Sequence, residues 1–380
     1  MMTINLAPLP LPASADSAIL NDFGREVKGL HPAHLGTSFQ QVKQALYTYG
    51  ALLRPSTPNP PPTGTATARS TKPKPPFSTR TSRRSLVSRR CSSSGTGSST
   101  ITKAFPKLSS STRTIQAFTR HMYPTKMRRT GVTRFFRWHM DAALYDLDPP
   151  RVTALYGIRV PEGPDQVVRY DDGSGDELEV PLGTTAFVSG KVMFDILPLE
   201  LKSVAVRAKA KYAPKPFEWM KDARAVETGL GVESEGLEKS LSELDWDKEK
   251  IKIYPFLWKN PVTGDLHFEV HPCAIMEIYV DPVPAKARQE GVLYPDGAHI
   301  TNLKQVRELC YKMQRPGITP RLVYPHAWQE KDLMLFHNRG VMHSVVGVFG
   351  QDQVRVFHQC NLAASDAPEG PNEGDVIKWA

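Results

Sequence analysis

Residues 332–349 read DLMLFHNRGVMHSVVGVF, and this stretch decides the expected fold. Two β-prone runs flank a turn, and similar short runs recur at 151–160 (RVTALYGIRV), 184–190 (TTAFVSG), 251–260 (IKIYPFLWKN) and 353–360 (QVRVFHQC). Turn signals separate several of these runs, and helical patches lie between them at 199–208 and 302–313. We therefore expect a mainly β fold with helical insertions, built as a jelly roll or double-stranded β-helix.

Composition limits the class of protein. The 380 residues are 40% hydrophobic and 23% charged, which suits a globular chain with a sizeable core. No run approaches the roughly 18 apolar residues of a membrane helix, and the start of the chain does not resemble a secretory signal. The four cysteines are dispersed without a CxxC pair, and GxGxxG and P-loop motifs are absent. We expect a cytoplasmic protein without a nucleotide-binding α/β fold.

Three zones follow one another along the chain. Residues 1–53 look folded, because apolar residues recur at near-helical spacing in two series, and 47–53 are expected to enter a strand. The first series is Ile19, Leu20, Phe23, Val27 and Leu30, and the second is Phe39, Val42, Ala45 and Leu46. Residues 131–380 have the pattern of a β-rich domain.

Residues 54–130 break the pattern. They contain 16 of the 48 Lys and Arg residues and none of the 39 Asp and Glu residues, so the rest of the chain carries a net charge of −7. A segment so rich in Ser, Thr, Arg and Pro cannot bury enough apolar surface to offset its ordering entropy. Two explanations stay open. The segment is a disordered basic linker able to bind nucleic acid, or it is an out-of-frame or mis-spliced stretch of coding sequence.

A candidate metal site begins at His139 and Asp141, within the run RFFRWHMDAALY (134–145). Residues i and i+2 of a strand point to the same face, so this imidazole and this carboxylate can share one metal ion. An HxD triplet alone is common by chance, and a further ligand is needed to make the prediction specific.

A rival set, His267, Glu269 and His271, alternates along LHFEVHP. On one strand its outer residues would stand about 13 Å apart, too far for three ligands of one ion. We therefore interpret the rival as a polar strand face.

The strand–turn–strand unit at 332–349 supplies the third ligand, His343. A turn at 350–352 leads to the next strand, and a hairpin can bring one face of that strand beside His343. By period two, that face carries Arg355, Phe357, Gln359 and Asn361.

Together these motifs resemble a known family. An HxD, a distant His within [WF]xNRxxxH and an Arg about twelve residues later are typical of taurine-dioxygenase-like (TauD/TfdA) enzymes. The likeness covers residues 19–53 and 131–365. Within the family, TRFFRWHMDAALYDLDPPRVTALYGIRVP (133–161), LWKNPVTG (257–264) and FHNRGVMHSVVG (336–347) are most similar to fungal 2-oxoglutarate-dependent xanthine dioxygenases.

The resemblance implies a cofactor set and a chemistry. Fe(II) is expected on His139, Asp141 and His343, with the remaining positions open for 2-oxoglutarate and O2. Arg355 is expected to pair with the far carboxylate of 2-oxoglutarate, and Thr185 in GTTAF to donate its hydroxyl to the same group. The expected products from the co-substrates are succinate and CO2.

The resemblance also implies a substrate. Xanthine would be hydroxylated at C8 to urate, with Gln359 and Asn361 binding the purine. Other substrate contacts of the family come from sequence that is replaced here by the 54–130 block. Two alternatives stay open: a dioxygenase of the same family acting on a sulfonate or aryloxyacetate, and an inactive β-helix protein whose basic segment binds nucleic acid or a partner.

Several conspicuous residues are interpreted as structural. Phe135, Phe136 and Trp138 are expected in the wall or core, and Cys360 as a packed thiol. Asn338 and Arg339 are expected to shape the turn before His343, and His337 stands where many relatives carry Asp. The sequence leaves the oligomeric state open.

Overall fold

The computed structural model describes residues 4–29, 35–56, 115–122, 133–141, 148–232, 237–287, 291–347, 353–362 and 364–380. Leu30 and most of the basic block therefore lie outside the described residues. None of the helices in these ranges is long and apolar enough to cross a bilayer.

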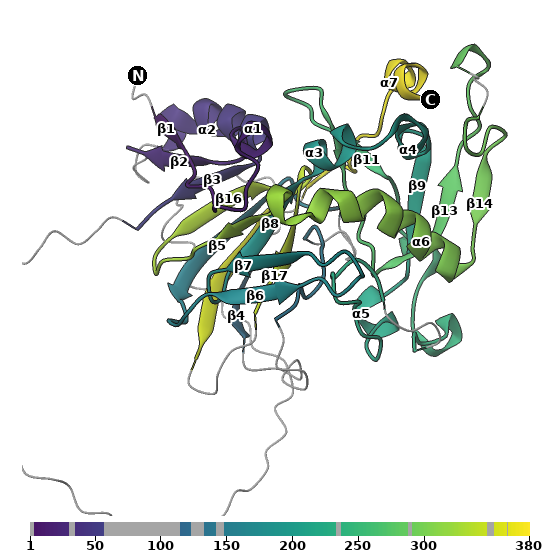
Figure 1. Cartoon of the computed structure of the whole chain (residues 1–380). Helices are drawn as coiled ribbons and strands as arrows, with labels where there is room; N and C mark the ends of the chain where they lie inside the picture. The colour runs from purple at the N-terminus through teal and green to yellow at the C-terminus, as the bar shows by residue number, and fades with distance from the viewer. Residues whose placement is uncertain are drawn as a thin grey trace, which may run out of the picture. The chain divides into compact units, whose positions relative to one another are not determined.

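Seven strands form the larger sheet, in which all neighbours except β2 and β3 pair antiparallel (Figure 1). In order across the sheet they are β1 (Asn5–Pro8), β2 (Arg25–Lys28), β3 (Ala51–Arg54), β16 (Leu333–His337), β5 (Val152–Arg159), β18 (Arg355–Leu362) and β4 (Ile115–Met122). In β5, Thr153, Leu155 and Gly157 are buried while the residues between them are only half-buried. This alternation gives the sheet an inner face and an outer face.

A second sheet packs against that inner face. Its strands, in order, are β15 (Tyr324–His326), β8 (Thr185–Ser189) and β17 (Val341–Val345). Residues 133–141 extend it, because Phe135 bridges Val346 and His139 bridges His343 in antiparallel fashion. The hydrophobic core between the sheets joins Phe187 of β8 to Phe336 of β16, whose rings meet edge to face with centroids 5.4 Å apart.

The rest of the described chain forms a four-stranded sheet, two two-stranded sheets and the helices. The remaining strands are β6 (Gln166–Arg169), β7 (Glu177–Val180), β9 (Ala208–Tyr212), β10 (Ile253–Pro255), β11 (Leu257–Lys259), β12 (Leu266–Phe268), β13 (Ile275–Val280) and β14 (Ala298–Ile300). The α-helices are α1 (Ser17–Leu20), α2 (Leu35–Tyr49), α3 (Gly190–Asp195), α4 (Leu199–Ala205), α5 (Pro216–Trp219), α6 (Leu303–Gln314) and α7 (Glu373–Trp379). Short 3-10 turns lie at Leu241–Glu243, Lys248–Lys250, Ala285–Ala287, Arg315–Ile318 and Pro320–Leu322. The helical patch expected at 302–313 is confirmed as α6, and the patch expected at 199–208 is confirmed only over Leu199–Ala205, because Ala208 begins β9.

The N-terminal expectations are confirmed only in part. The second apolar series forms α2, and a strand follows it as β3. The first series is not one helix: α1 ends at Leu20, and Val27 lies buried in strand β2. Gly24 separates α1 from β2 with a φ of 72°, a conformation that residues other than glycine rarely adopt. Pairing with β1 and β3 then holds the residues of β2 in a strand.

Two further expectations need correction. The basic block contains a strand, because Ile115–Met122 forms β4 and pairs along the whole of β18. The runs at 342–349 and 353–360 do not form a hairpin, since β17 lies in the smaller sheet and β18 in the larger one. The chain crosses between sheets after β17, and the two strands therefore face each other across the core rather than pairing edge to edge.

Candidate metal and co-substrate site

His139, Asp141 and His343 come together, as the sequence predicts. Each offers one ligand atom, and these atoms all lie within 4.8 Å of one another. The imidazole centroids are 4.2 Å apart, and His343 Nε2 lies 3.8 Å from Asp141 Oδ2. Asp141 and His343 are buried and His139 is half-buried. Two imidazoles and one carboxylate on one side of an ion suit Fe(II) that must keep positions open for other ligands.

The backbone fixes the spacing of the two histidines. His139 N donates to His343 O at 3.0 Å, and His343 N donates to His139 O at 2.9 Å. The His139 Nδ1 lies 2.9 Å from the carbonyl oxygen of Arg137. A carbonyl only accepts, so Nδ1 carries the proton and Nε2 is left as the metal-binding atom.

Asn338 holds the carboxylate ligand in place. Its Oδ1 accepts from Asp141 N at 2.7 Å, and its Nδ2 donates to Asp141 O and Pro150 O, each at 3.0 Å. The neighbouring Arg339 donates twice to Pro149 O, at 3.0 and 2.8 Å. The expectation that these two residues shape the turn is confirmed, and the contacts add a second role: they anchor both ends of the segment that follows the HxD motif.

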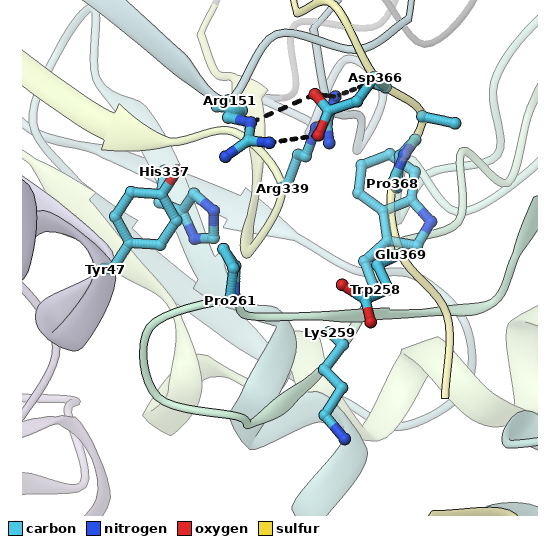
Figure 2. A pocket seen from close by; sticks show the side chains of 11 residues that line it. Tyr47, Arg151, Trp258, Lys259, Pro261, His337, Arg339, Asp366, Pro368 and Glu369 are labelled. Atoms are coloured by element: carbon cyan, nitrogen blue, oxygen red, sulfur yellow. Dashed lines mark hydrogen bonds and ion pairs between the residues drawn. The ribbon is translucent and has the colours of Figure 1, made fainter. Parts of the chain in front are cut away.

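Figure 2 shows Arg339 together with Arg151 and Asp366, which lie beside it. Asp366 bonds Arg151 through its carboxylate, and its carbonyl oxygen accepts from Arg339 at 2.6 Å. The hydrogen bond from Arg151 lowers the pKa of Asp366 below its ordinary value. A cavity of about 40 Å³ lies beside these side chains.

Arg355 and Thr185 form a second polar group. Arg355, buried on β18, donates from Nε to Gly183 O at 2.8 Å and from Nη2 to Thr185 Oγ1 at 2.8 Å. Trp328 Nε1 also donates to Thr185 Oγ1, at 3.0 Å. Because the hydroxyl oxygen accepts two hydrogen bonds, its own proton remains to be donated. A guanidinium and a directed hydroxyl proton are the groups that bind a carboxylate.

This polar group faces the metal site. Thr185 pairs with Val345 in the β8–β17 ladder, and Val345 is two residues from His343. Residues two apart share a strand face and are separated by about 7 Å. Thr185 and His343 therefore point into the same space between the sheets. Trp328 had no signal in the sequence, because only the fold brings β15 and its following loop beside β8.

Gln359 and Asn361 lie where period two predicts. Both are 3% exposed, on the same inner face of β18 as Arg355 and Phe357. Gln359 Nε2 lies 3.5 Å from Asn361 Oδ1. Amides in an otherwise apolar core retain donors and acceptors for a polar ligand.

The rival row is buried throughout. His267, Glu269 and His271 are at most 6% exposed, the apolar residues between them are also buried, and β12 ends at Phe268. The expected polar face is therefore not a surface. Among the described residues, only the set of His139, Asp141 and His343 brings three metal-ligating groups within reach of one ion.

His267 forms a buried pair with His337 beside the strands of the candidate metal site. Their rings meet edge to face at 5.9 Å, and His267 Nδ1 lies 3.1 Å from Gly340 O. A Cβ on Gly340 would stand 2.6 Å from His337 Nδ1 and 2.8 Å from His267 Nδ1, so only glycine fits. Burial lowers the pKa of both histidines, and both are neutral in the folded protein.

This pair predicts an acid-sensitive fold. A histidine whose folded pKa is lowered contributes stability that is complete above its unfolded pKa of about 6.5 and is lost as pH falls below it. We expect the free energy of unfolding to fall below pH 6.5, by up to about 1.4 kcal/mol per pH unit for each histidine. Urea titrations at several pH values should show that the free energy of unfolding falls less steeply below pH 6.5 in His337→Asn than in the wild type. An unchanged slope in His337→Asn would contradict the assignment.

The remaining aromatic and thiol expectations are mixed. Phe135 and Trp138 are buried in the core, as expected. Phe136 is 49% exposed and belongs to neither wall nor core, because the bridge at Phe135 turns the next side chain outward. Cys360 is half-buried on the outer face of β18.

The chain has relatives among known proteins. The model of the taurine catabolism dioxygenase TauD, TfdA family matches residues 15–361. The chain belongs to the TauD/TfdA family. Two curated relatives are alpha-ketoglutarate-dependent xanthine dioxygenases. The Emericella nidulans protein is 52% identical over 235 residues, covering 62% of this chain and 60% of that one. The Schizosaccharomyces pombe protein is 48% identical over 246 residues, covering 64% and 57%.

The chain thus spans about 60% of the length of these TauD/TfdA relatives. Solved structures agree on the fold. The crystal structure of AAD-2 in complex with Mn(II) and N-oxalylglycine matches with a TM-score of 0.54 and 16% identity, over 97% of this chain and 100% of that one. A taurine dioxygenase from Burkholderia xenovorans matches with a TM-score of 0.51 and 14% identity, over 98% of each chain. At these identities the likeness shows the TauD/TfdA fold alone.

Proposed function

We propose that the protein is a non-haem Fe(II)/2-oxoglutarate-dependent dioxygenase that hydroxylates xanthine at C8 to urate and converts 2-oxoglutarate and O2 to succinate and CO2. One observation carries the proposal. Three metal-binding side chains meet within 4.8 Å, and the Arg355–Thr185 group stands about 7 Å along the same sheet face. Membership of a dioxygenase family and relatives named xanthine dioxygenases support it.

His139, Asp141 and His343 would hold the iron, which supplies the activation of O2 when it is bound. The hydrogen bond to the Arg137 carbonyl keeps His139 Nε2 available as a ligand. The ring of Phe336 lies 4.8 Å from that of His343 and packs one side of the ligand. Such apolar packing keeps the ligands oriented and excludes water from the reacting groups.

Arg355 and Thr185 would bind the far carboxylate of 2-oxoglutarate. The guanidinium is held by the Gly183 carbonyl, and Trp328 fixes the direction of the Thr185 hydroxyl. This anchoring would orient the diacid with its keto acid end toward the metal ligands. Because the fold already positions Arg355, Thr185, Gly183 and Trp328, the binding of 2-oxoglutarate would need little rearrangement.

Gln359 and Asn361 would bind the purine. Their amides match an edge that alternates N–H donors and carbonyl acceptors, as xanthine does. An anionic sulfonate or aryloxyacetate would instead favour a further Arg or Lys at these positions. The two amides therefore support the purine over the acidic alternatives.

The architecture and the basic block complete the proposal. The two sheets on either side of the site would be the halves of a double-stranded β-helix, formed by residues 1–53 and 131–380. Residues 54–130 would be an out-of-frame or mis-spliced stretch of coding sequence that replaces family sequence in this domain. Sequencing genomic DNA and transcript across these codons tests it: a frame-restoring indel or splice junction at each end supports the proposal, and an unbroken frame overturns it.

Substrate assignment has a direct test. We expect the purified protein with the intact reading frame restored, supplied with Fe(II), ascorbate and 2-oxoglutarate, to form urate from xanthine with one succinate for each urate. Taurine and an aryloxyacetate should give no more succinate than a substrate-free control. Chromatographic quantification of urate and succinate decides the outcome. Succinate formation stimulated by taurine but not by xanthine would overturn the purine assignment while keeping the dioxygenase chemistry.

A further inference from the structure

Thr153 presents a hydroxyl that the fold does not use. Thr153 is fully buried on β5, and its Oγ1 has no hydrogen-bond partner among the described residues. Burying a hydroxyl without a partner is unfavourable, because its contacts with water are lost and not replaced. Valine has nearly the same shape and would fill the position without this penalty. A buried threonine of this kind therefore needs an explanation outside the folded chain.

The ladders of the larger sheet place this hydroxyl at the level of the metal site. Thr153 pairs directly with Phe336 on β16 and with Asn361 on β18. Directly paired residues of antiparallel strands project their side chains from the same face. The Phe336 ring lies 4.8 Å from the ring of His343. Phe336, Thr153 and Asn361 thus form a row that starts beside His343 and crosses the inner face of the sheet.

The row contains complementary groups. Phe336 offers an apolar surface beside the metal ligand. Thr153 and Asn361 come next, and Gln359 lies two residues from Asn361 on the same face. A hydroxyl and two amides each donate and accept, and none of the three carries a charge. A neutral ring with N–H and C=O groups side by side satisfies all three, whereas a carboxylate or sulfonate leaves their donors and acceptors mismatched.

We propose that Thr153 is a third substrate-binding residue, whose hydroxyl hydrogen-bonds a neutral lactam-type heterocycle together with Gln359 and Asn361. The inference rests on the proposed function and deepens it by naming the class of substrate and a residue that selects it. A substrate hydrogen bond supplies the partner that the folded chain lacks. The inference also makes a distinctive claim: the hydroxyl serves binding at the expense of stability.

Thr153→Val tests this claim. The affinity for xanthine is measured by equilibrium dialysis without O2, in the presence of Fe(II) and 2-oxoglutarate, so that turnover is not required. We expect Thr153→Val to bind xanthine about 3- to 10-fold more weakly, the range for one neutral hydrogen bond. Its melting temperature should be equal to or higher than that of the wild type. Thr153→Ser keeps the hydroxyl and should retain the wild-type affinity within twofold.

Thr228→Val is the matched control. Thr228 is also buried, but its Oγ1 accepts a hydrogen bond from Leu230 N at 3.4 Å. Loss of this hydrogen bond in Thr228→Val should lower the melting temperature and leave the affinity for xanthine unchanged. An affinity loss of at least twofold in Thr153→Val, restored in Thr153→Ser, supports the inference. A smaller loss, or a lower melting temperature in Thr153→Val, overturns it. Wild type that fails to bind xanthine at all overturns the proposed function itself.

Discussion

His139→Ala and Asp141→Ala should each abolish the weak visible charge-transfer band that Fe(II) and 2-oxoglutarate give together in an anaerobic protein solution. Each substitution removes one of only three protein ligands, and the described part of the chain has no further ligand set that could replace it. Loss of an outer contact that orients a metal ligand typically lowers metal affinity 10- to 100-fold, and loss of the ligand itself should lower it further. Titrating Fe(II) under nitrogen and following the band gives the measurement.

His299→Ala is the control for this experiment. His299 is an exposed histidine on β14 that hydrogen-bonds Glu277 at 2.8 Å, so it removes an imidazole without touching the proposed site. It should leave the band at full intensity. Circular dichroism at the same temperature separates loss of the metal from loss of the fold. A full band in either ligand variant would rule out the metal assignment.

Arg355→Ala should weaken 2-oxoglutarate binding by about 10- to 150-fold, with little change in Fe(II) affinity. A charge-assisted hydrogen bond is worth roughly 1.5–3 kcal/mol, and the far carboxylate would lose its main partner in a buried pocket. Arg355→Lys should recover only part of the affinity, because one ammonium cannot reproduce a planar two-donor fork. Titration of 2-oxoglutarate into the iron-loaded proteins gives the three midpoints.

Arg169→Ala serves as the matched arginine control. Arg169 is half exposed and pairs with Asp171 on the surface hairpin, away from the site. Its midpoint should equal that of the wild type. If Arg355→Ala, Arg355→Lys and wild type share one midpoint, Arg355 does not bind the co-substrate, and the proposed position of 2-oxoglutarate between the sheets is wrong.

Motifs with local spacing predicted much of the site. His139 and Asp141 are two residues apart, so one extended segment decides their common face. His343 follows a turn motif, and the alternation of β18 assigns Gln359 and Asn361 to the inner face. In each case the relevant geometry spans a few residues, and sequence periodicity describes it well.

Features that depend on distant pairing were missed. Trp328 and Thr153 gain their importance only from strands that lie beside them in the fold, and neither stands in a motif. The expected hairpin between β17 and β18 failed because closeness in sequence does not decide which sheet a strand joins. The row from His267 to His271 looked like a polar face because alternation alone cannot show that both sides are covered. Helical spacing from Ile19 to Val27 failed for a similar reason, since tertiary pairing overrode it.

The two backbone hydrogen bonds between His139 and His343 join segments about 200 residues apart in the chain. On a ribosome that adds 5–20 residues per second, roughly 10–40 s separate the synthesis of the two histidines. Through that interval the nascent chain carries two ligands that cannot close a site, and an ion held by only two groups exchanges readily. Under the proposed function, iron that bound the complete set would stabilise the fold only after β17 has formed. Metal loading would thus depend on the pairing of residues 133–141 with β17, and a chain truncated before β17 would be unable to retain iron.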